Sequence, residues 1–448
     1  MSGDEADRVV LTPEQALEVA VDLHRQGRVL EAAEIYRNLL TLRPDDPGLL
    51  HFYAVAAHQL GHSADAILLL DQVVAARPEW ADAHNNLGNV LKESQRLEEA
   101  AASYERAIAL RPDEADFHSN LGVVFKRLDR LEEAERSLRR ALALRSDHGA
   151  AFHNLGAVLF RMDRIDEAAA AFREAVRLSP GRAAPWRHLA ASLARAGRMD
   201  DVRAVFDQWL AFEPDNPSAL HMVAALFGDQ VPERASDGFV RALFDPYSGD
   251  FDAHIARLEY RAPDLIAAAL DRALGPERCG LDILDAGVGT GLCGPNLRPR
   301  ARRLVGVDLS GGMIARAQAR GLYDRLEVAE LTHWLAATEE TFDAAVSADT
   351  LCYFGVLEGV LSGFARVLRP GGLLAFTVEH WMDGDDRGWR LQPNGRYAHA
   401  EAYVRFALAG SGFVIRVSEP AVLRLEGGQP VAGLVVVAAR PEGPSRTQ

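Results

Sequence analysis

Three copies of one tripeptide lie 34 residues apart: Asn86-Leu87-Gly88, Asn120-Leu121-Gly122 and Asn154-Leu155-Gly156. A series of alanines keeps the same step, at Ala32, Ala66, Ala100, Ala134 and Ala168. Each unit closes with a proline, except for one that closes with Ser146. A constant period of this length is typical of repeat proteins, in which each repeat is one small supersecondary unit. Six units of 34 residues therefore run over residues 13–216 without insertion or deletion.

The residue pattern of one unit predicts a pair of packed helices. The small residue at the eighth position, such as Gly88, lets two helices approach, and a large residue such as Tyr104 fills the space between them. Glycine or aspartate stands at five of the helix-to-helix turns, at Gly27, Gly61, Asp129, Asp163 and Gly197. This pattern resembles the tetratricopeptide repeat, which implies a superhelix whose concave groove takes peptides or protein partners. We expect a repeat domain over residues 13–228, with an amphipathic helix at 218–227 as its cap.

Asn86, Asn120 and Asn154 occupy the sixth position of the first helix in three successive units. Stacking of the repeats would place them in a row on the concave face, where side-chain amides can bond to an extended peptide backbone. The run from His84 to Asn89 is similar to the repeats of O-linked N-acetylglucosamine transferases, whose asparagine ladder holds peptides. The alternative is that asparagine is only a polar residue at an exposed helical position. We predict these three asparagines as partner-binding residues.

After Pro232 the repeat stops, and helical patterns alternate with short β-rich runs. Such alternation predicts a mostly parallel sheet with crossover helices. We expect seven strands, at Leu281–Leu284, Arg303–Val307, Leu326–Ala329, Phe342–Ala348, Leu373–Val378, Phe413–Arg416 and Val431–Ala439. The sequence predicts a helix at 357–368, and a loop or hairpin between the last two strands.

Glycines cluster where the first strand would turn into a helix, in Leu284-Asp285-Ala286-Gly287-Val288-Gly289-Thr290-Gly291. Val307-Asp308-Leu309-Ser310 follows the second strand, and Leu368-Arg369-Pro370-Gly371-Gly372 precedes the fifth. These motifs, in this order, resemble those of class I S-adenosylmethionine-dependent methyltransferases. The resemblance covers residues 237–440 and implies a Rossmann-like α/β domain that binds S-adenosyl-L-methionine. The chain is thus expected to join an all-α solenoid to a class I methyltransferase domain.

The resemblance also implies a set of cofactor-binding residues. Asp308 would bind the ribose hydroxyls, Leu309 would pack on the adenine, and Glu330 would accept from the adenine amino group. Met313 would form an apolar wall of the site or, alternatively, an ordinary part of the core. The remaining members lie in the glycine loop and at the methionine end: Asp285, Gly287, Gly289, Gly291 and Asp349.

A nicotinamide dinucleotide is the alternative cofactor, because Gly289-Thr290-Gly291-Leu292-Cys293-Gly294 also fits a dinucleotide fingerprint. Asp285 opposes it, because a carboxylate at the end of the first strand would repel a pyrophosphate. The turn Pro370-Gly371-Gly372 before a strand is likewise typical of the methyltransferases rather than of dinucleotide-binding enzymes. We therefore expect S-adenosyl-L-methionine.

Lid helices over the cofactor are expected in residues 237–275, with aromatic contacts from Tyr247, Phe251 and Tyr260. The alternative role of these aromatic residues is packing of a helix on the sheet. Methyl transfer from a sulfonium needs a base only when the acceptor has to lose a proton. Candidate catalytic residues lie on loops after the strands: Asp349, Tyr353, Glu379, His380 and His399. His399 has the alternative of capping a helix that begins near Ala400.

The composition and a missing motif restrict the function further. The formal net charge of −15 argues against a dedicated nucleic-acid binder, and no apolar run is long enough to span a bilayer. Three cysteines without a CxxC pair predict neither disulfides nor a metal site. Ala348-Asp349-Thr350-Leu351 replaces the Asn-Pro-Pro-Tyr signature of amide or adenine methylation, which leaves a carboxylate, hydroxyl, carbon or side-chain acceptor.

We therefore expect a cytoplasmic methyltransferase whose repeats recruit a protein or peptide substrate or partner. Its oligomeric state stays open. One alternative is a small-molecule methyltransferase whose repeats serve only for association. The other is a repeat scaffold with an inert cofactor domain.

Overall fold

The computed structural model describes residues 11–245, 251–275, 277–382 and 387–442, apart from the side chains at positions 253 and 254. The chain divides into two compact units, Met1–Phe212 and Glu213–Gln448. Each unit has its own hydrophobic clusters, so we describe each by itself.

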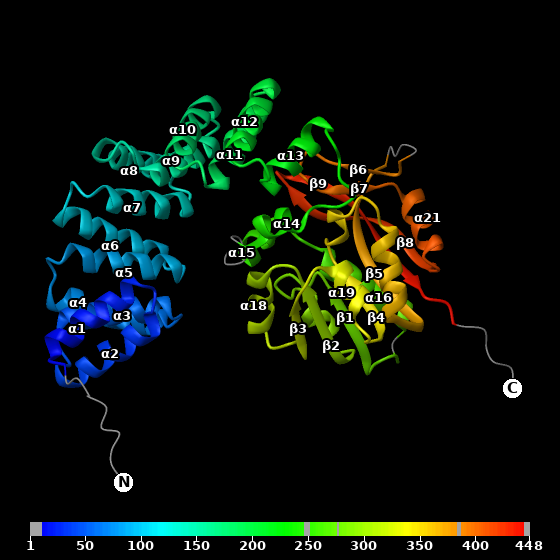
Figure 1. The fold of residues 1–448 in the computed structure, drawn as a ribbon, viewed down its shortest axis with the longest axis horizontal. Helices are drawn as coiled ribbons and strands as arrows, with labels where there is room; N and C mark the ends of the chain where they lie inside the picture. Colours follow the sequence, from blue (N-terminus) through cyan, green and yellow to red (C-terminus); the bar gives the residue numbers. More distant parts are fainter. Residues whose placement is uncertain (1–10, 246–250, 276, 383–386, 443–448) are drawn as a thin grey trace, which may run out of the picture. The chain divides into compact units, whose positions relative to one another are not determined.

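The first unit consists of six helix pairs that keep the 34-residue step of the sequence (Figure 1). The first helices of the pairs are α1 (Pro13–Arg25), α3 (Pro47–Gln59), α5 (Ala81–Glu93), α7 (Ala115–Arg127), α9 (Gly149–Arg161) and α11 (Ala183–Arg195). The second helices are α2 (Val29–Leu42), α4 (Ser63–Ala76), α6 (Leu97–Leu110), α8 (Leu131–Leu144), α10 (Ile165–Leu178) and α12 (Met199–Phe212). The predicted repeat solenoid is therefore confirmed.

The turns inside the repeats explain the glycines and aspartates of the sequence. One residue in each turn has a left-handed backbone, with φ between 60° and 89°. Glycine adopts this conformation without strain, and aspartate does so more readily than most residues. The sixth such position is Gln95, with φ of 62°, which the sequence pattern did not mark.

The glycines at the eighth position allow the two helices of a repeat to touch. A Cβ atom on Gly88, Gly122 or Gly156 would lie within 2.6–2.8 Å of a side chain of the second helix. Those side chains are the large residues of the period: Tyr104, Leu138 and Phe172. Each glycine therefore fixes the distance between the helices of its repeat.

Replacement of Gly156 by alanine tests this packing. Alanine normally favours a helix over glycine by about 1 kcal/mol. Here its Cβ would lie 2.7 Å from Phe172, so we expect the first unit to lose about 1–3 kcal/mol of unfolding free energy. Urea unfolding of the full chain, followed by circular dichroism, measures the change. Gly181→Ala is the control, because a Cβ there meets no atom within 4 Å. Equal stability of the parent and Gly156→Ala would contradict the packing argument.

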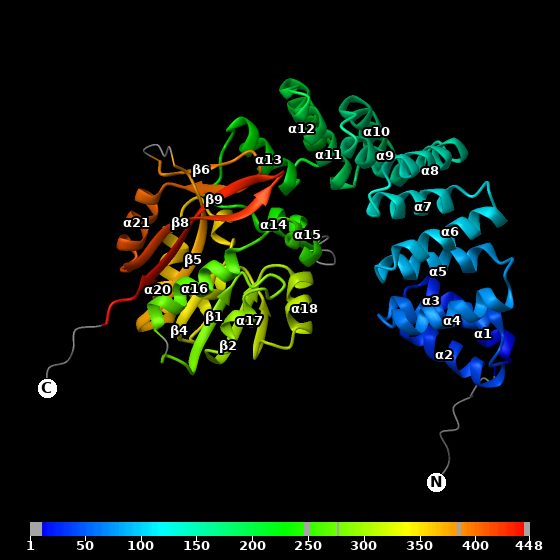
Figure 2. The ribbon, with the colours of Figure 1, turned by 180° about the vertical axis from the view of Figure 1, so that it is seen from behind.

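The second unit contains a nine-stranded sheet in its described residues. Five of its strands run parallel, from the edge strand inward in the order β3 (Arg325–Val328), β2 (Ala301–Asp308), β1 (Leu281–Ala286), β4 (Phe342–Ser347) and β5 (Leu368–His380). β9 (Gln429–Ala439) pairs antiparallel with β5, and β8 (Val414–Glu426) pairs antiparallel with β9 (Figure 2).

The predicted mostly parallel sheet is thus confirmed, with two differences. The expected sixth strand is much longer than 413–416, because β8 and β9 form one long hairpin. Two short strands, β6 (Trp389–Leu391) and β7 (Tyr397–His399), add to the predicted seven. Each has only three residues, which is too few for a recognisable alternation of buried and exposed positions.

Helices cover both faces of this sheet. On one face, α16 (Ala262–Leu274) and α17 (Gly294–Leu297) pack into a cluster that includes Ile266 and Leu297. On the other face, α19 (Leu331–Ala337), α20 (Glu358–Val367) and α21 (Glu401–Gly410) contribute to a larger cluster. The described elements left over are the short turn η2 (Leu351–Tyr353), α13 (Pro217–Phe227), α14 (Asp237–Phe244), α15 (Phe251–Arg257) and α18 (Gly311–Ala319).

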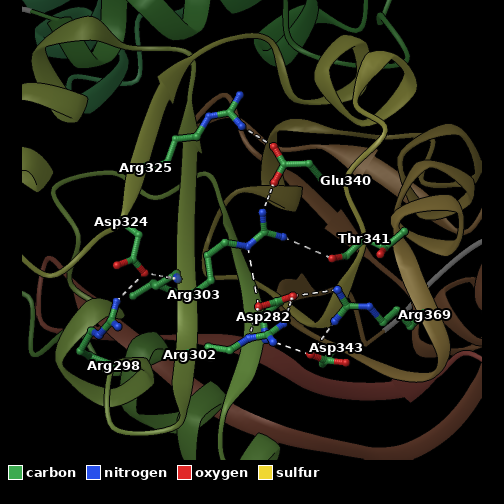
Figure 3. A network of polar contacts seen from close by, with 11 residues as sticks. Asp282, Arg298, Arg302, Arg303, Asp324, Arg325, Glu340, Thr341, Asp343 and Arg369 are labelled. Atoms are coloured by element: carbon green, nitrogen blue, oxygen red, sulfur yellow. Dashed lines mark hydrogen bonds and ion pairs between the residues drawn. The ribbon is translucent and has the colours of Figure 1, made fainter.

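Ion pairs cover the amino-terminal ends of the central strands (Figure 3). The side chain of Asp282 is 5% exposed and pairs with Arg302 and Arg369, each at 2.7 Å. Asp343 binds the backbone N–H of Asp282 at 2.9 Å and also pairs with Arg369. Burial by itself would raise the pKa of Asp282, but the neighbouring arginines outweigh this effect and hold the pKa below its usual value. These charged groups bind one another, so they hold the strands together at this end of the sheet.

The helix predicted at 218–227 forms as α13, and the division of the chain assigns it to the second unit. His221 Nε2 lies 2.9 Å from the carbonyl oxygen of Gly395, and its ring stacks on Phe239. We therefore describe α13 with the α/β unit, and the role of residues 218–227 as the cap of the last repeat stays a prediction. No helix among the described residues is long and apolar enough to cross a membrane.

Candidate active site

A cavity opens at the carboxyl ends of the parallel strands of the second unit. Its wall includes the residues that follow β1, β2, β3 and β4, in loops that contain Gly287, Leu309, Glu330 and Asp349. β1 lies between β2 and β4, so the connections diverge to opposite sides at this point. In open α/β sheets, ligands bind where the strand order reverses in this way.

The loop after β1 requires glycine at its three glycine positions for different structural reasons. A Cβ on Gly287 would clash with Thr350, and one on Gly291 would press on Tyr323 and Arg320 beside α18. At Gly289, where φ is 53°, a Cβ would meet no protein atom within 4 Å. Gly287 and Gly289 line the cavity, whereas Gly291 is not part of its wall. Gly289 is thus the position where the backbone leaves open space for a ligand.

Asp308 ends β2, and two backbone N–H groups hold its carboxylate. Gly289 donates to Oδ2 at 2.8 Å, and Ser310 donates to Oδ1 at 2.9 Å. Burial raises the pKa of Asp308, although these two bonds act in the opposite direction. Each oxygen keeps a second lone pair, so the carboxylate can still accept from two hydroxyl groups. Leu309 and Met313 line the cavity beside it.

Glu330 also lines the cavity, but its carboxylate has a structural partner. It caps α19 by accepting from the backbone N–H groups of Thr332, at 3.1 Å, and His333, at 2.8 Å. A contact with an adenine amino group would therefore share the carboxylate with this cap.

Asp285 is not part of the cavity wall, contrary to its predicted position at the methionine end. Its side chain is buried, and the hydroxyl of Tyr323 donates to its Oδ2 at 2.7 Å. Burial raises the pKa of Asp285 to about 7, although the bond from Tyr323 acts in the opposite direction. Because Tyr323 also lies against Gly291, this hydrogen bond supports the glycine loop.

Of the predicted lid residues, Phe251 and Tyr260 line the cavity. Tyr247 lies outside the described residues. Phe244 of α14 is a third aromatic residue in the wall, and its ring meets Phe251 at 6.2 Å between centroids. These side chains give the cavity an apolar cover.

The lid is attached at two places. Asp252 of α15 accepts from the hydroxyl of Thr290 in the glycine loop at 2.5 Å and pairs with Arg320. The segment between α15 and α16 bonds to the backbone of β8, since Arg261 N–H donates to Leu423 and Leu425 N–H donates to Leu258. The lid is therefore fixed to the glycine loop and to β8 together.

Two of the predicted catalytic residues, Asp349 and Tyr353, line the cavity. Asp349 has a left-handed backbone, with φ of 50°, and its Oδ1 accepts from the hydroxyl of Thr377 at 3.1 Å. Burial raises the pKa of Asp349 and that of Tyr353, the latter to about 12. The carboxylate of Asp349 is thus engaged, and the Tyr353 hydroxyl keeps its proton at neutral pH.

The other three predicted catalytic residues are not part of the wall. His399 is fully buried, its Nε2 lies 3.2 Å from the carbonyl oxygen of Gly355, and burial lowers its pKa to about 4. It does not cap α21 either, because Ala400 is the N-cap residue. His380 stands opposite His399 in the pairing of β5 with β7. Glu379 is buried and binds arginines.

Two arginines that the sequence analysis missed line the cavity, Arg396 and Arg424. Arg424 of β8 pairs with Asp349 at 2.7 Å, with Glu379, and with Glu426 at 2.7 Å. We call these five side chains the arginine network. A signal for Arg396 existed, since it directly follows the turn-forming pair Asn394-Gly395, but nothing near Arg424 marks it apart from other strand residues.

In the first unit, the three predicted asparagines lie on first helices of successive repeats, and each bonds to a neighbouring repeat. Asn86 Nδ2 lies 2.8 Å from His51 Nε2, and Asn120 Nδ2 donates to Asn85 Oδ1 at 3.0 Å. Asn154 accepts from Lys126 Nζ at 2.8 Å. The asparagines thus form part of a polar row across the repeats, but they are less free than a simple ladder of exposed amides.

The pKa of Asp285 predicts how stability depends on pH. Between about pH 4 and pH 7, the unfolded chain releases this proton while the folded chain keeps it, so the parent protein loses stability as the pH rises. Asp285→Asn has no such proton, and we expect its stability relative to the parent to increase by about 1–3 kcal/mol from pH 5 to pH 8. Urea unfolding at several pH values measures this. Asp271→Asn, at a surface pair with Arg300, is the control and should show no such trend. A pH-independent difference would mean that Asp285 is ionised in the folded chain.

Comparisons with known proteins agree with this geometry. Residues 284–376 match the family described as methyltransferase domain. Residues 88–129 match a TPR repeat family, and residues 23–88, 113–181 and 159–226 match tetratricopeptide repeat families.

Individual proteins are similar to one or the other part of the chain. Methyltransferase-like protein 27 of Homo sapiens is 41% identical over 30% of this chain and 56% of its own length. Malonyl-[acyl-carrier protein] O-methyltransferase of Yersinia pestis is 28% identical over 28% of this chain and 48% of its own length. The chain thus spans about half the length of these relatives. The crystal structure of YrrB, a TPR protein with an unusual peptide-binding site, is 22% identical, with a TM-score of 0.36, over 42% of this chain and 97% of that one. The matches to the family models show that the chain joins tetratricopeptide repeats to a methyltransferase domain.

Proposed function

We propose that the second unit transfers a methyl group from S-adenosyl-L-methionine to an acceptor that enters the same cavity. The observation that carries this proposal is the carboxylate of Asp308, which Gly289 and Ser310 hold at 2.8 and 2.9 Å beside open space at Gly289. A carboxylate fixed in this way fits the two hydroxyls of a ribose. Leu309 and Met313 supply apolar walls for an adenine.

The chain's own residues would position and shield the reactants. When bound, the cofactor supplies a methyl group on a positively charged sulfur. The aromatic side chains Phe244, Phe251 and Tyr260 would exclude water from the cavity, and Asp252 would keep the lid on the glycine loop. Alignment and exclusion of water account for most of what a protein contributes to such a displacement.

Calorimetric titration of the full chain tests the cofactor. We expect S-adenosyl-L-methionine and S-adenosylhomocysteine to bind and NAD not to bind. Asp308→Asn keeps the shape of the side chain but loses its charge, so the affinity for S-adenosylhomocysteine should fall by about tenfold or more.

Asp271→Asn is the control, because Asp271 lies on α16 outside the cavity wall. It should bind as the parent does. A folded protein that binds neither sulfur ligand would contradict the proposal and favour a repeat scaffold with an inert α/β unit.

We further propose that the repeats recruit a protein or peptide partner along their polar row. The row crosses four repeats, and each of its members His51, Asn86, Asn120 and Asn154 bonds to a residue of an adjacent repeat. Asn120 Oδ1 and Asn154 Nδ2 have no hydrogen-bond partner within the described part of the chain. These groups suit the N–H and C=O groups of an extended peptide.

Two lysines extend the row. Lys92 and Lys126 are the chain's only lysines, and they stand 34 residues apart on α5 and α7. Lys126 donates to Asn154, and burial lowers its pKa to about 8, which leaves it mostly charged at neutral pH. A partner segment with an acidic group would fit this position.

Methylation of a partner tests the role of the row. We expect Asn120→Ala combined with Lys126→Met to reduce labelling of proteins from the source cells by about tenfold, since two or three hydrogen bonds are lost. Labelling with a tritiated methyl donor measures this, and the affinity for S-adenosylhomocysteine should stay unchanged. Arg106→Ala, an exposed site on α6, is the control. Unchanged labelling by the double variant would contradict recruitment of the substrate by this row and favour repeats that serve only for association.

A further inference from the structure

The guanidinium of Arg396 carries hydrogen-bond donors in the cavity wall that no carboxylate or carbonyl oxygen of the described residues accepts. Its side chain is 26% exposed and lines the cavity. Nη1 pairs with Glu426 and lies 3.5 Å from Glu379. Within the described ranges, no carboxylate or carbonyl oxygen accepts from its Nε or Nη2, and the neutral hydroxyl of Tyr353 is the other side-chain group that bonds to this guanidinium.

Arg424 shows that this openness is specific to Arg396. Arg424 is 1% exposed, and each of its three nitrogen atoms binds a carboxylate, those of Glu426, Asp349 and Glu379. The arginine network therefore engages all three nitrogen atoms of Arg424 but only Nη1 of Arg396. The remaining Nε and Nη2 of Arg396 form one edge of a planar guanidinium, which among the described side chains meets no charged partner and only the neutral hydroxyl of Tyr353. Such an edge matches the two oxygens of a carboxylate.

Apart from Asp308 and Glu330, which the cofactor would engage, the described side chains of the cavity also include no available base. The carboxylate of Asp349 is bound to Thr377 and Arg424. Burial raises the pKa of the Tyr353 hydroxyl to about 12 and that of the Cys293 thiol as well. An alcohol, thiol or amine that had to lose a proton would find no group here to take it.

We propose that the methyl acceptor is a carboxylic acid, and that Arg396 receives its carboxylate through Nε and Nη2. This inference rests on the proposed dependence on S-adenosyl-L-methionine. A carboxyl group with a pKa of about 4 is already ionised at neutral pH, so it needs no base. One carboxylate oxygen forms the bond to the methyl carbon while the methyl–sulfur bond breaks and its electron pair stays on sulfur. The product is a methyl ester, and no proton is transferred.

The methyl donor carries a carboxylate of its own, on its methionine part. Arg396 could hold that group instead, because the chemistry of recognition is the same. The test must therefore separate the affinity for the donor from the affinity for an acceptor.

Calorimetry of the full chain saturated with S-adenosylhomocysteine makes this separation. The probes are straight-chain carboxylates from acetate to dodecanoate, benzoate, and the matching primary amides. We expect at least one acid to bind about tenfold tighter than its amide. Arg396→Gln should remove this preference and leave the affinity for S-adenosylhomocysteine within about twofold. Arg396→Lys keeps the charge beside Glu426 but loses the planar edge, so it should recover only part of the preference.

Arg390→Gln is the matched control, because Arg390 lies over the ring of Trp381 and outside the cavity wall. The acids that bind should also accept a tritiated methyl group, and alkali should release the label as methanol. Equal binding of acids and amides, or an alkali-stable product, would overturn the inference. A large loss of S-adenosylhomocysteine affinity in Arg396→Gln would assign Arg396 to the donor instead. A parent protein that binds no S-adenosylhomocysteine would overturn the proposed function itself.

Discussion

The α/β unit depends on one buried guanidinium, that of Arg424, which joins parts of the chain that lie far apart in the sequence. It binds Asp349 after β4 and Glu379 near the end of β5. The register of β8 against β9 shifts between Val422 and Arg424, and such a bulge re-aims the side chains around it. The backbone of the adjacent Leu423 also holds the lid. Removal of one partner from a buried ion pair costs about 3–5 kcal/mol, so the floor and the cover of the cavity share one constraint.

The repeat unit is built on a different constraint, the contact of each glycine at the eighth position with a large residue of the second helix. This contact recurs at Gly88, Gly122 and Gly156 and sets the same helix distance in successive repeats. A constant geometry is what allows polar groups such as Asn85 and Asn120 to meet across repeat boundaries. The regular packing of the interior thus generates a regular polar surface, which is the property that an extended partner requires.

Features encoded locally could be predicted from the sequence, and features made by long-range packing could not. The 34-residue period anticipates the helix pairs, because each repeat contacts mainly its neighbours. The glycine loop and Asp308 were likewise visible, since a strand, a turn and a helix are consecutive in the chain. The role of His399 was not, because its burial against Gly355 depends on two short strands of three residues. Arg396 and Arg424 were missed because their partners come from the loop after β4, from β5 and from β8, which only the sheet brings together.

The central claim is that a methyl donor occupies the cavity with its ribose on Asp308. A crystal structure of the full chain grown with S-adenosylhomocysteine tests this most directly. The account predicts both ribose hydroxyls on the Asp308 carboxylate, the adenine between Leu309 and Met313, and the Nε and Nη2 edge of Arg396 facing open space beside the sulfur. Density for the ligand elsewhere, or none at a saturating concentration, would contradict the account.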